Sequence, residues 1–174
     1  MTVEVRIEPW GQDDLALLRR TNAPEMMAHL GGPETEEQLR ARHERYLQRR
    51  GAGGGGMFRI VLSPTGEPAG TIGYWERPWR GETVYETGWS VLPEYQGRGI
   101  AVAAGREIIG LATEAASAGD GPRSLHAYPK VDNPASNAIC RRLGFTLVEE
   151  CDFEYPAGHP IRCNDWRLEL TPAG

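Results

Sequence analysis

A glycine-containing turn, residues 96–101 (Gln-Gly-Arg-Gly-Ile-Ala), joins a strand-like segment to a helix-like one. Gly97 and Gly99 lack a Cβ atom, so backbone N–H groups of the turn can come close to a ligand. The first N–H groups of the following helix have no partner within it, and its dipole favours an anion there. Arg98 adds a positive charge. The turn therefore predicts a site for a phosphate or pyrophosphate group.

Three other interpretations of this turn have to be compared with the sequence: a P-loop, a dinucleotide-binding turn and a turn without a ligand. A P-loop ends in Gly-Lys-Ser or Gly-Lys-Thr, which this sequence lacks. A dinucleotide-binding turn needs a third glycine where Val102 stands. A strand-to-helix turn without any ligand has the same appearance, because glycine-rich breaks are common, and the turn alone does not decide against it.

A second informative segment spans residues 133–145 and reads as a capped helix followed by a strand. Asn133 can cap the helix, Pro134 suits its first position, and Gly144 can end it. Ser136 and Cys140 are four residues apart, so they share one face of that helix.

Taken together, the two segments resemble the acyl-CoA-binding signatures of the GCN5-related N-acetyltransferase (GNAT) superfamily. The first is Gln96-x-x-Gly99-x-Ala101, and the second is Asn133-x-x-Ser136 followed by residues 143–145 (Leu-Gly-Phe). The resemblance extends from about Val3 to Leu170 and is closest to the group that acetylates ribosomal-protein N-termini, as the ribosomal-protein-alanine N-acetyltransferases do. The chain departs from many members at Val102, Ala103 and Cys140, where Thr or Ser, Glu and Tyr are frequent.

The resemblance implies that acetyl-CoA is the co-substrate, that no metal takes part, and that a primary amine attacks the thioester directly in a ternary complex. The turn would hold the pyrophosphate, and a β-bulge at residues 89–91 would let backbone groups meet the pantetheine arm and the thioester carbonyl. Asn133 and Asn137 would hydrogen-bond the pantetheine amides. The expected donor-binding residues are Trp89, Ser90, Val91, Gln96, Gly97, Arg98, Gly99, Ile100, Ala101, Asn133 and Asn137.

Direct transfer needs a group that takes the amine proton and one that gives a proton to the departing thiolate. Glu86 matches a frequent position of the base in the family, although a strand carboxylate facing solvent is a competing reading. Ser136 is the first choice for the acid, with helix capping as its alternative role. Cys140 is the second choice, although a buried cysteine on a helix usually belongs to the core.

Aromatic residues on neighbouring strands, together with a segment between the first helices, are expected to bind the acceptor. Trp75 and Tyr85 could contact an amine through their rings, although most aromatic residues in strands serve packing. His29 belongs to residues 22–33, which could fold over the acceptor. The acceptor class stays open between a small-molecule amine and a protein N-terminus.

Size and composition suit a soluble enzyme. The 174 residues fit one domain, residues 1–174, and a net charge of −5 makes nucleic acid an improbable partner. No apolar run approaches the ~20 residues that cross a bilayer, and the N-terminus does not read as a signal peptide, so we expect a cytoplasmic protein. Three cysteines and four histidines show neither disulfide nor metal spacing.

The periodicity of apolar residues predicts an α/β (α+β) fold, with a mixed, mostly antiparallel sheet flanked by helices. The final strands could pair across a homodimer. The competing functions are those of a non-catalytic acyl-CoA-binding sensor or partner module, and of an enzyme that transfers another acyl group. Strands are expected at 3–8, 58–62, 69–75, 83–91, 124–128, 145–149 and 162–170, long helices from 12, 35, 100 and 134, and loops at 51–56 and 77–81.

Overall fold

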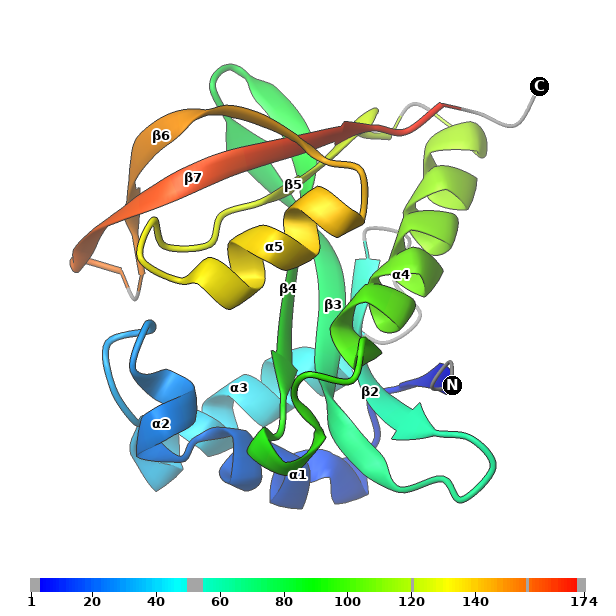
Figure 1. Ribbon diagram of the computed structural model, residues 1–174, viewed down its shortest axis with the longest axis vertical. Helices are drawn as coiled ribbons and strands as arrows, with labels where there is room; N and C mark the ends of the chain where they lie inside the picture. Colours follow the sequence, from blue (N-terminus) through cyan, green and yellow to red (C-terminus); the bar gives the residue numbers. More distant parts are fainter. Residues whose placement is uncertain (1–3, 50–54, 120, 156, 172–174) are drawn as a thin grey trace.

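The computed structural model describes residues 4–49, 55–119, 121–155 and 157–171. Seven strands form one sheet in the order β1-β2-β3-β4-β5-β7-β6, flanked by helices (Figure 1). This confirms the predicted α/β fold. The strands are β1 (Val5–Pro9), β2 (Gly55–Leu62), β3 (Pro68–Trp79), β4 (Glu82–Val91), β5 (Ser124–Ala127), β6 (Thr146–Glu154) and β7 (Pro160–Glu169). The α-helices are α1 (Leu15–Thr21), α2 (Pro24–Met27), α3 (Glu36–Gln48), α4 (Ile100–Ser117) and α5 (Pro134–Arg142), with 3-10 turns η1 (Gln12–Asp14) and η2 (Pro93–Tyr95).

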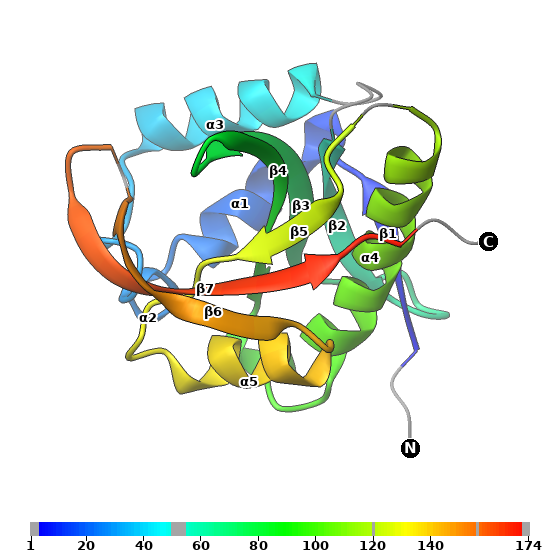
Figure 2. The ribbon, with the colours of Figure 1, turned by 90° about the horizontal axis from the view of Figure 1, so that it is seen from above.

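Helices cover both faces of the sheet. Figure 2 shows α1 and α3 on one side and α4 and α5 on the other. Helix α4 lies on the sheet because Ala104, Ile108 and Ala112 recur every four residues and are all buried in the main core. On the other face, residues of α1 and α3 such as Leu18 and Leu39 pack with Met57 of β2. No described helix is long and apolar enough to span a membrane.

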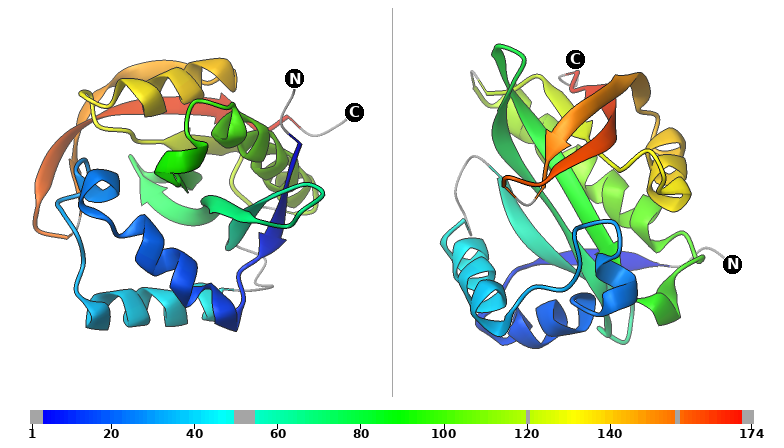
Figure 3. Two further views of the ribbon diagram at one scale, coloured as in Figure 1. Left: turned by 60° about the horizontal axis from the view of Figure 1, so that its bottom comes forward. Right: turned by 90° about the vertical axis from the view of Figure 1, so that its left-hand side faces the viewer.

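The two ends of the sheet are built differently. In Figure 3 the N-terminal helices lie at one end of the molecule, and the β6–β7 hairpin with α5 lies at the opposite end. Five of the six neighbouring strand pairs are antiparallel, and β4–β5 is parallel.

The predicted loop over residues 51–56 falls partly outside the described residues, and Gly55 and Gly56 already belong to β2.

Strand β3 is longer than the sequence predicts, and the expected loop at residues 77–81 is wrong for its first three members. Arg77, Pro78 and Trp79 continue β3 and pair with β4. Pro78 has no N–H to donate, and on the side of β3 away from β4 it has no partner among the described residues of β2, the first of which is Gly55, opposite Trp75. The extension places Arg77 and Trp79 beside β4.

Strands β4 and β5 diverge after a very short pairing. Their register contains Tyr85↔Leu125 and Glu86↔His126, after which β4 runs on to Val91. The expected bulge over residues 89–91 is absent from the β3–β4 pairing, which keeps one register from Gly70↔Val91 to Trp79↔Glu82. The opening therefore comes from β5 turning away, and it leaves one edge of β4 unpaired beyond Glu86.

The backbone of β4 presents free groups to this opening. The Leu92 N–H donates to the Ala69 carbonyl at 2.8 Å. Because successive residues of an antiparallel strand point their N–H and C=O groups to alternate sides, Trp89 and Val91 direct theirs away from β3. An extended ligand could pair with them as a further strand would.

Strand β7 serves both faces of the sheet with three consecutive residues. On the face covered by α4 and α5, the side chains of Asn164 and Trp166 both donate to Oδ1 of Asn137 on α5, each at 2.8 Å. On the opposite face, Asp165 bonds to His126 of β5. One strand thus positions α5 and a buried polar pair at the same time.

Candidate active site

A cleft of about 760 Å³ follows the opening between β4 and β5. One end is formed by the turn before α4 and the start of α5, and the other by α2, α3, β3 and the β6–β7 hairpin. Most residues expected to bind the donor line it. These are Trp89, Ser90, Val91, Gln96, Gly97, Gly99, Ile100, Ala101 and Asn133.

The end of the cleft at α4 has the features of an anion site. Gly97 and Gly99 both adopt φ of 77°, and a Cβ atom at either position would meet no atom within 4 Å. The Ala103 N–H donates to the Gly99 carbonyl, so the helix begins there and the N–H groups of the three residues before Ala103 face outward at its start. These backbone N–H groups form a cradle that fits a pyrophosphate. The negative charge of a pyrophosphate is favoured there because the cradle lies at the positive end of the 18-residue helix α4.

Gln96 and Arg98 take positions that the sequence does not predict. The Gln96 Nε2 donates to the Val91 carbonyl at 2.9 Å, so that carbonyl is occupied, while the Val91 N–H still faces the opening. Arg98 lies with its guanidinium 5.7 Å from the Tyr95 ring and is not among the residues that line the cleft. Gln96 therefore organises the β4 edge, and the anion site described above consists of backbone groups.

Of the two candidate acids on α5, Ser136 lines the cleft and Cys140 does not. Asn133 Oδ1 accepts from the Ser136 N–H at 3.2 Å, and Asn133 Nδ2 donates to Ser136 Oγ at 3.3 Å. Because Oγ accepts from Asn133, its own proton is available to another acceptor. Cys140 is 0% exposed, and burial raises the pKa of its thiol to about 12. The proposal of a catalytic Cys140 therefore conflicts with its place in the core.

Asn137 is also misassigned as a donor-binding residue. Its Nδ2 donates to the backbone carbonyls of Lys130 and Asn133, and its Oδ1 accepts from Asn164 and Trp166. The side-chain amide is fully used inside the protein. Asn137 fixes α5 to β7 and has no group left for pantetheine.

Glu86 lies where β4 and β5 part, and its carboxylate lines the cleft. The Arg77 NH1 donates to its Oε1 at 2.7 Å, and the side chain is 16% exposed. Burial raises the pKa of Glu86, while the neighbouring Arg77, Trp75 and His126 act in the opposite direction. A carboxylate with a raised pKa is the more effective proton acceptor near neutral pH.

Arg77 was not predicted from the sequence as part of the site. Its guanidinium carbon lies 4.5 Å from the Phe153 ring centre, 5.4 Å from that of Tyr128 and 5.6 Å from that of Trp79. Three rings and one carboxylate thus hold a single cation in place. One feature of the sequence could have indicated its role: Arg77 follows Trp75 by two residues, so the two side chains share one face if the strand continues. The sequence instead favours a loop at residues 77–81.

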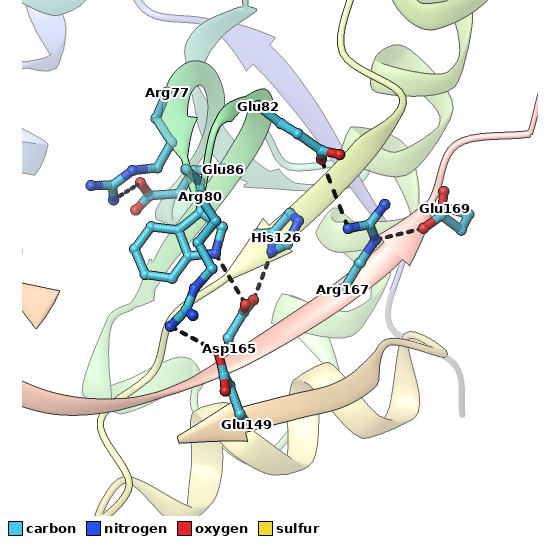
Figure 4. Close-up of polar contacts among 10 residues, drawn as sticks. Arg77, Arg80, Glu82, Glu86, His126, Glu149, Asp165, Arg167 and Glu169 are labelled. Carbon is cyan, nitrogen blue, oxygen red and sulfur yellow. Dashed lines mark hydrogen bonds and ion pairs between the residues drawn. The ribbon is translucent and has the colours of Figure 1, made fainter. Parts of the chain in front are cut away.

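A buried histidine–aspartate pair lies on the same face of the sheet as Glu86. His126 Nδ1 and Asp165 Oδ1 are 2.6 Å apart, and the Trp79 Nε1 donates to Asp165 Oδ2 at 3.1 Å. Figure 4 shows His126 and Asp165 pointing toward each other, with Arg77 at the Glu86 carboxylate. His126 is 1% exposed and Asp165 2%. No feature of the local sequence around either residue indicates this pairing.

The other end of the cleft is largely aromatic. Trp75 and His29 line it as expected, together with Met27, Tyr46, Tyr128, Phe153, Tyr155 and Ile161. His29 Nδ1 lies 3.3 Å from Asp132 Oδ1, so residues after α2 contact the loop before α5. Tyr85 does not take part. It is 1% exposed and packs edge-on against Tyr74, with 5.2 Å between ring centres, in the core under α4.

Among residues 4–49, 55–119, 121–155 and 157–171, no group of three or more His, Cys, Asp or Glu side chains is arranged to hold a metal ion. The groups described above as candidates for chemistry are the paired carboxylate of Glu86, the hydroxyl of Ser136 and backbone N–H groups.

Solved structures of acetyltransferases share this fold. A GNAT-family acetyltransferase from Bacillus anthracis aligns with a TM-score of 0.75 and 19% identity, covering 98% of this chain and 99% of its own. A Salmonella typhimurium enzyme described as modifying the N-terminal serine of ribosomal protein L7/L12 gives 0.73 and 22%, covering 97% and 96%. A putative acetyltransferase from the same organism, solved with acetyl-CoA, gives 0.74 and 20%, covering 100% and 97%.

Curated protein sequences offer no match to this chain. The acetyltransferase (GNAT) domain model, however, matches residues 4–146, which include the β4 edge, the glycine turn and α5. The chain therefore belongs to the GNAT acetyltransferase family.

Proposed function

We propose that the protein transfers an acetyl group from acetyl-CoA to a primary amine by direct attack. The observation that carries this proposal is the position of Glu86 in the cleft. It stands where the free edge of β4 begins, between the anion-binding turn at one end and the aromatic pocket at the other. A thioester held along β4 and an amine held in the pocket would meet beside this carboxylate.

The donor would be held by backbone groups. When bound, acetyl-CoA supplies an activated acetyl group as a thioester. The helix start after Gly99 would hold its pyrophosphate, and the Trp89 and Val91 N–H groups would pair with its extended arm. The Val91 N–H is also suited to stabilise negative charge on the thioester carbonyl oxygen.

Proton transfers would fall to two side chains on opposite sides of the β4–β5 opening. Glu86 would accept the amine proton, because it must be ionised to act and its raised pKa improves its basicity. Ser136 would donate its hydroxyl proton toward the departing thiolate, with solvent replacing that proton. Asn133 fixes the Ser136 oxygen for this role.

The lining favours an acceptor with one ammonium group on an apolar body. Glu25 and Glu86 are the acidic residues that line the cleft, whereas Arg42, Lys130 and Arg142 are basic. A polyamine would meet too few carboxylates, while the rings of Trp75, Tyr128 and Phe153 can cover an apolar or aromatic body. An arylalkylamine or a peptide whose first side chain is apolar has this character.

A panel of amines tests the proposal by release of free CoA from acetyl-CoA. The panel contains 2-phenylethylamine, spermidine, glutamate and an alanine-initiated peptide amide, and acetyl-CoA binding is measured by calorimetry in parallel. We expect turnover with 2-phenylethylamine or the peptide and little with spermidine. Binding without turnover across the panel would favour the acyl-CoA sensor instead, and absence of binding would overturn the proposal.

A further inference from the structure

One face of helix α5 lines the cleft from the second residue of the helix to its last. The residues on this face recur every three or four positions, and they are Ala135, Ser136, Ala138, Ile139 and Arg142. The mechanism proposed above uses Ser136 and gives no role to Arg142, although Arg142 is an exposed charged residue.

Helix α5 leads away from the end of the cleft that would hold the acceptor. Before the helix, Asp132 Oδ1 lies 3.3 Å from Nδ1 of His29, which lines that end. After the helix, Leu143 packs on α4, where a Cβ atom built on Gly105 would lie 2.6 Å from the Leu143 Cδ1. Figure 1 shows α5 running from the side of α2 to the side of α4. Arg142, the neighbour of Leu143, therefore lies close to the first two turns of α4.

The charge of Arg142 is not neutralised by a neighbour, unlike the charges of the other cations in the cleft. The described arginine and lysine residues that line the cleft are Arg42, Lys130 and Arg142. Arg42 pairs with Glu34, and Lys130 Nζ lies 3.8 Å from Asp132 Oδ2. No ion pair joins Arg142 to a carboxylate among the residues that the structure describes. Its guanidinium is thus available to an anion that enters the cleft.

Two other arginines near α4 and α5 are turned to different partners. The Arg141 guanidinium lies 5.5 Å from the Trp166 ring centre, and that of Arg98 lies 5.7 Å from the Tyr95 ring centre. Neither residue lines the cleft. Arg142 is therefore the arginine of this region whose position suits a bound ligand.

Acetyl-CoA contains two separate phosphate groups that could meet this cation. Its pyrophosphate fits the backbone N–H groups at the start of α4, whereas no group described above would bind the 3′-phosphate of its ribose. Like other phosphate monoesters, the 3′-phosphate carries about −1.5 to −2 charges at neutral pH and presents three terminal oxygens. A planar guanidinium can donate two parallel hydrogen bonds to such a group.

The spacing along α5 agrees with this ligand. Ser136 and Arg142 are six residues apart, which is about 9 Å along a helix axis. With the thioester beside Ser136 and the pyrophosphate at the start of α4, the nucleotide part of the donor would lie further from the acceptor end than Ser136. Arg142 lies in that direction.

We infer that Arg142 binds the 3′-phosphate of the donor and makes the protein select thioesters of CoA over those of 3′-dephospho-CoA. The inference rests on the proposed function, in which acetyl-CoA occupies the cleft with its pyrophosphate at the turn before α4. Arg142 takes part in no covalent step, and its contribution is to the affinity and selectivity of donor binding.

Calorimetry with CoA and 3′-dephospho-CoA tests the inference, because the two ligands differ in that phosphate alone. The wild-type protein should bind CoA about 10-fold more tightly or better, as expected for hydrogen bonds between charged groups. Arg142→Gln should weaken CoA binding and leave the affinity for 3′-dephospho-CoA unchanged. Since Arg142 is exposed and Gln is a good helix former, the variant should remain folded. Equal weakening of both ligands would assign Arg142 to the pyrophosphate and overturn the inference.

Two further variants show whether the effect needs this side chain or only its charge. Arg141→Gln removes the neighbouring charge outside the cleft lining and should keep the wild-type preference for CoA. Arg142→Lys keeps the charge but loses the paired donors, so it should retain part of the preference. If Arg141→Gln loses as much of the preference as Arg142→Gln, a general field of positive charge explains the selectivity, and the specific contact is wrong.

The failure of this inference can be distinguished from the failure of the proposed function. If CoA and 3′-dephospho-CoA bind the wild-type protein equally well while amines are acetylated, the role of Arg142 is wrong and the proposed function stands. If the preference for CoA depends on Arg142 but no amine of the panel is acetylated, acetyl transfer fails as the function and the phosphate contact stands.

Discussion

The two ends of the cleft differ in the kind of groups that form them, backbone groups at one end and side chains at the other. The donor end consists of backbone: two left-handed glycines, the start of α4 and the unpaired edge of β4. The acceptor end consists of side chains from α2, α3, β3 and the β6–β7 hairpin, beside the Arg77–Glu86 and His126–Asp165 pairs. A backbone site tolerates change in side chains around it, whereas a side-chain network depends on each partner. Substitutions at the two ends should therefore have different effects, on acetyl-CoA affinity at the donor end and on kcat at the acceptor end.

The largest effect is expected at the acceptor end. Glu86→Gln keeps the shape of the side chain but removes the base, and kcat should fall by about 10²- to 10⁴-fold while acetyl-CoA affinity stays unchanged. Glu82→Gln on the same strand is the control, because Glu82 is exposed and distant from the cleft lining. Stopped assays of CoA release measure the rate. A Glu86→Gln enzyme at full speed would show that water or the substrate itself takes the proton.

The same carboxylate should set the acidic limb of the pH–rate profile. Burial raises the pKa of Glu86, so the ionised base is lost as pH falls through a value above the ordinary one for a glutamate. We expect kcat to rise with pH along this limb in the wild type and the limb to vanish in Glu86→Gln. An unchanged limb in the variant would assign it to another group.

The next effect is expected at the donor end. Gly99→Trp fills the open space over the turn and should weaken acetyl-CoA binding by about 100-fold or more, because two lost hydrogen bonds to a charged group are worth at least about 3 kcal/mol. Gly144→Trp is the matched control, since Gly144 also has a positive φ and no atom within 4 Å of a built Cβ, but lies outside the cleft lining. Calorimetry compares the two. Equal weakening in both, or in neither, would contradict the location of the anion site.

Asn137 should behave as a structural residue although it is next to Ser136. Asn137→Leu leaves the Lys130 carbonyl and the Trp166 N–H without their partner and should lower the free energy of unfolding by about 3 kcal/mol. Urea unfolding measures this loss. The KM for acetyl-CoA should change little at a temperature where the variant is folded, and a selective rise in KM with normal stability would restore Asn137 as a donor ligand.

The smallest catalytic effect is expected for Ser136. Ser136→Ala should lower kcat by about 10-fold, because a serine hydroxyl is a weak acid that water can partly replace. Cys140→Ala should instead lose stability, since it removes a buried side chain from the core. Parallel measurements of kcat and unfolding distinguish the two. Reversed outcomes would mean that the thiol reaches the thioester sulfur.

The turn before α4 and the cap of α5 could be predicted from the sequence because their signals are local. Gly97 and Gly99 lie within one turn, and the cap at Asn133 lies next to the Ser136 it fixes, so spacing alone places them. The order of strands and helices along the chain followed from apolar periodicity, although β3 and β6 continue past the ends expected for them, residues 75 and 149. Tyr85 was misplaced because alternation shows that neighbours in a strand face opposite sides, but not which side faces the helices.

The acceptor end could not be predicted because its contacts depend on long-range register. Asp165 meets His126 only because β7 pairs with β5 at one particular offset, 39 residues apart in the chain. Arg77 reaches Glu86 because β3 continues beyond Trp75 into a segment that reads locally as a loop on account of Pro78. Cys140 and Asn137 illustrate the same limit on α5, where spacing gives the face that each residue occupies but not what covers it.

The three consecutive residues 164–166 of β7 constrain how this protein can change over evolutionary time. A deletion or insertion of one residue within the strand would exchange its faces, turning Asp165 toward α5 and Asn164 or Trp166 toward His126. The anchor of α5 and the His126–Asp165 pair would be lost in a single event. Length variation among descendants of this chain should therefore be found in the turn between β6 and β7, while β7 itself accepts substitutions but not changes of length.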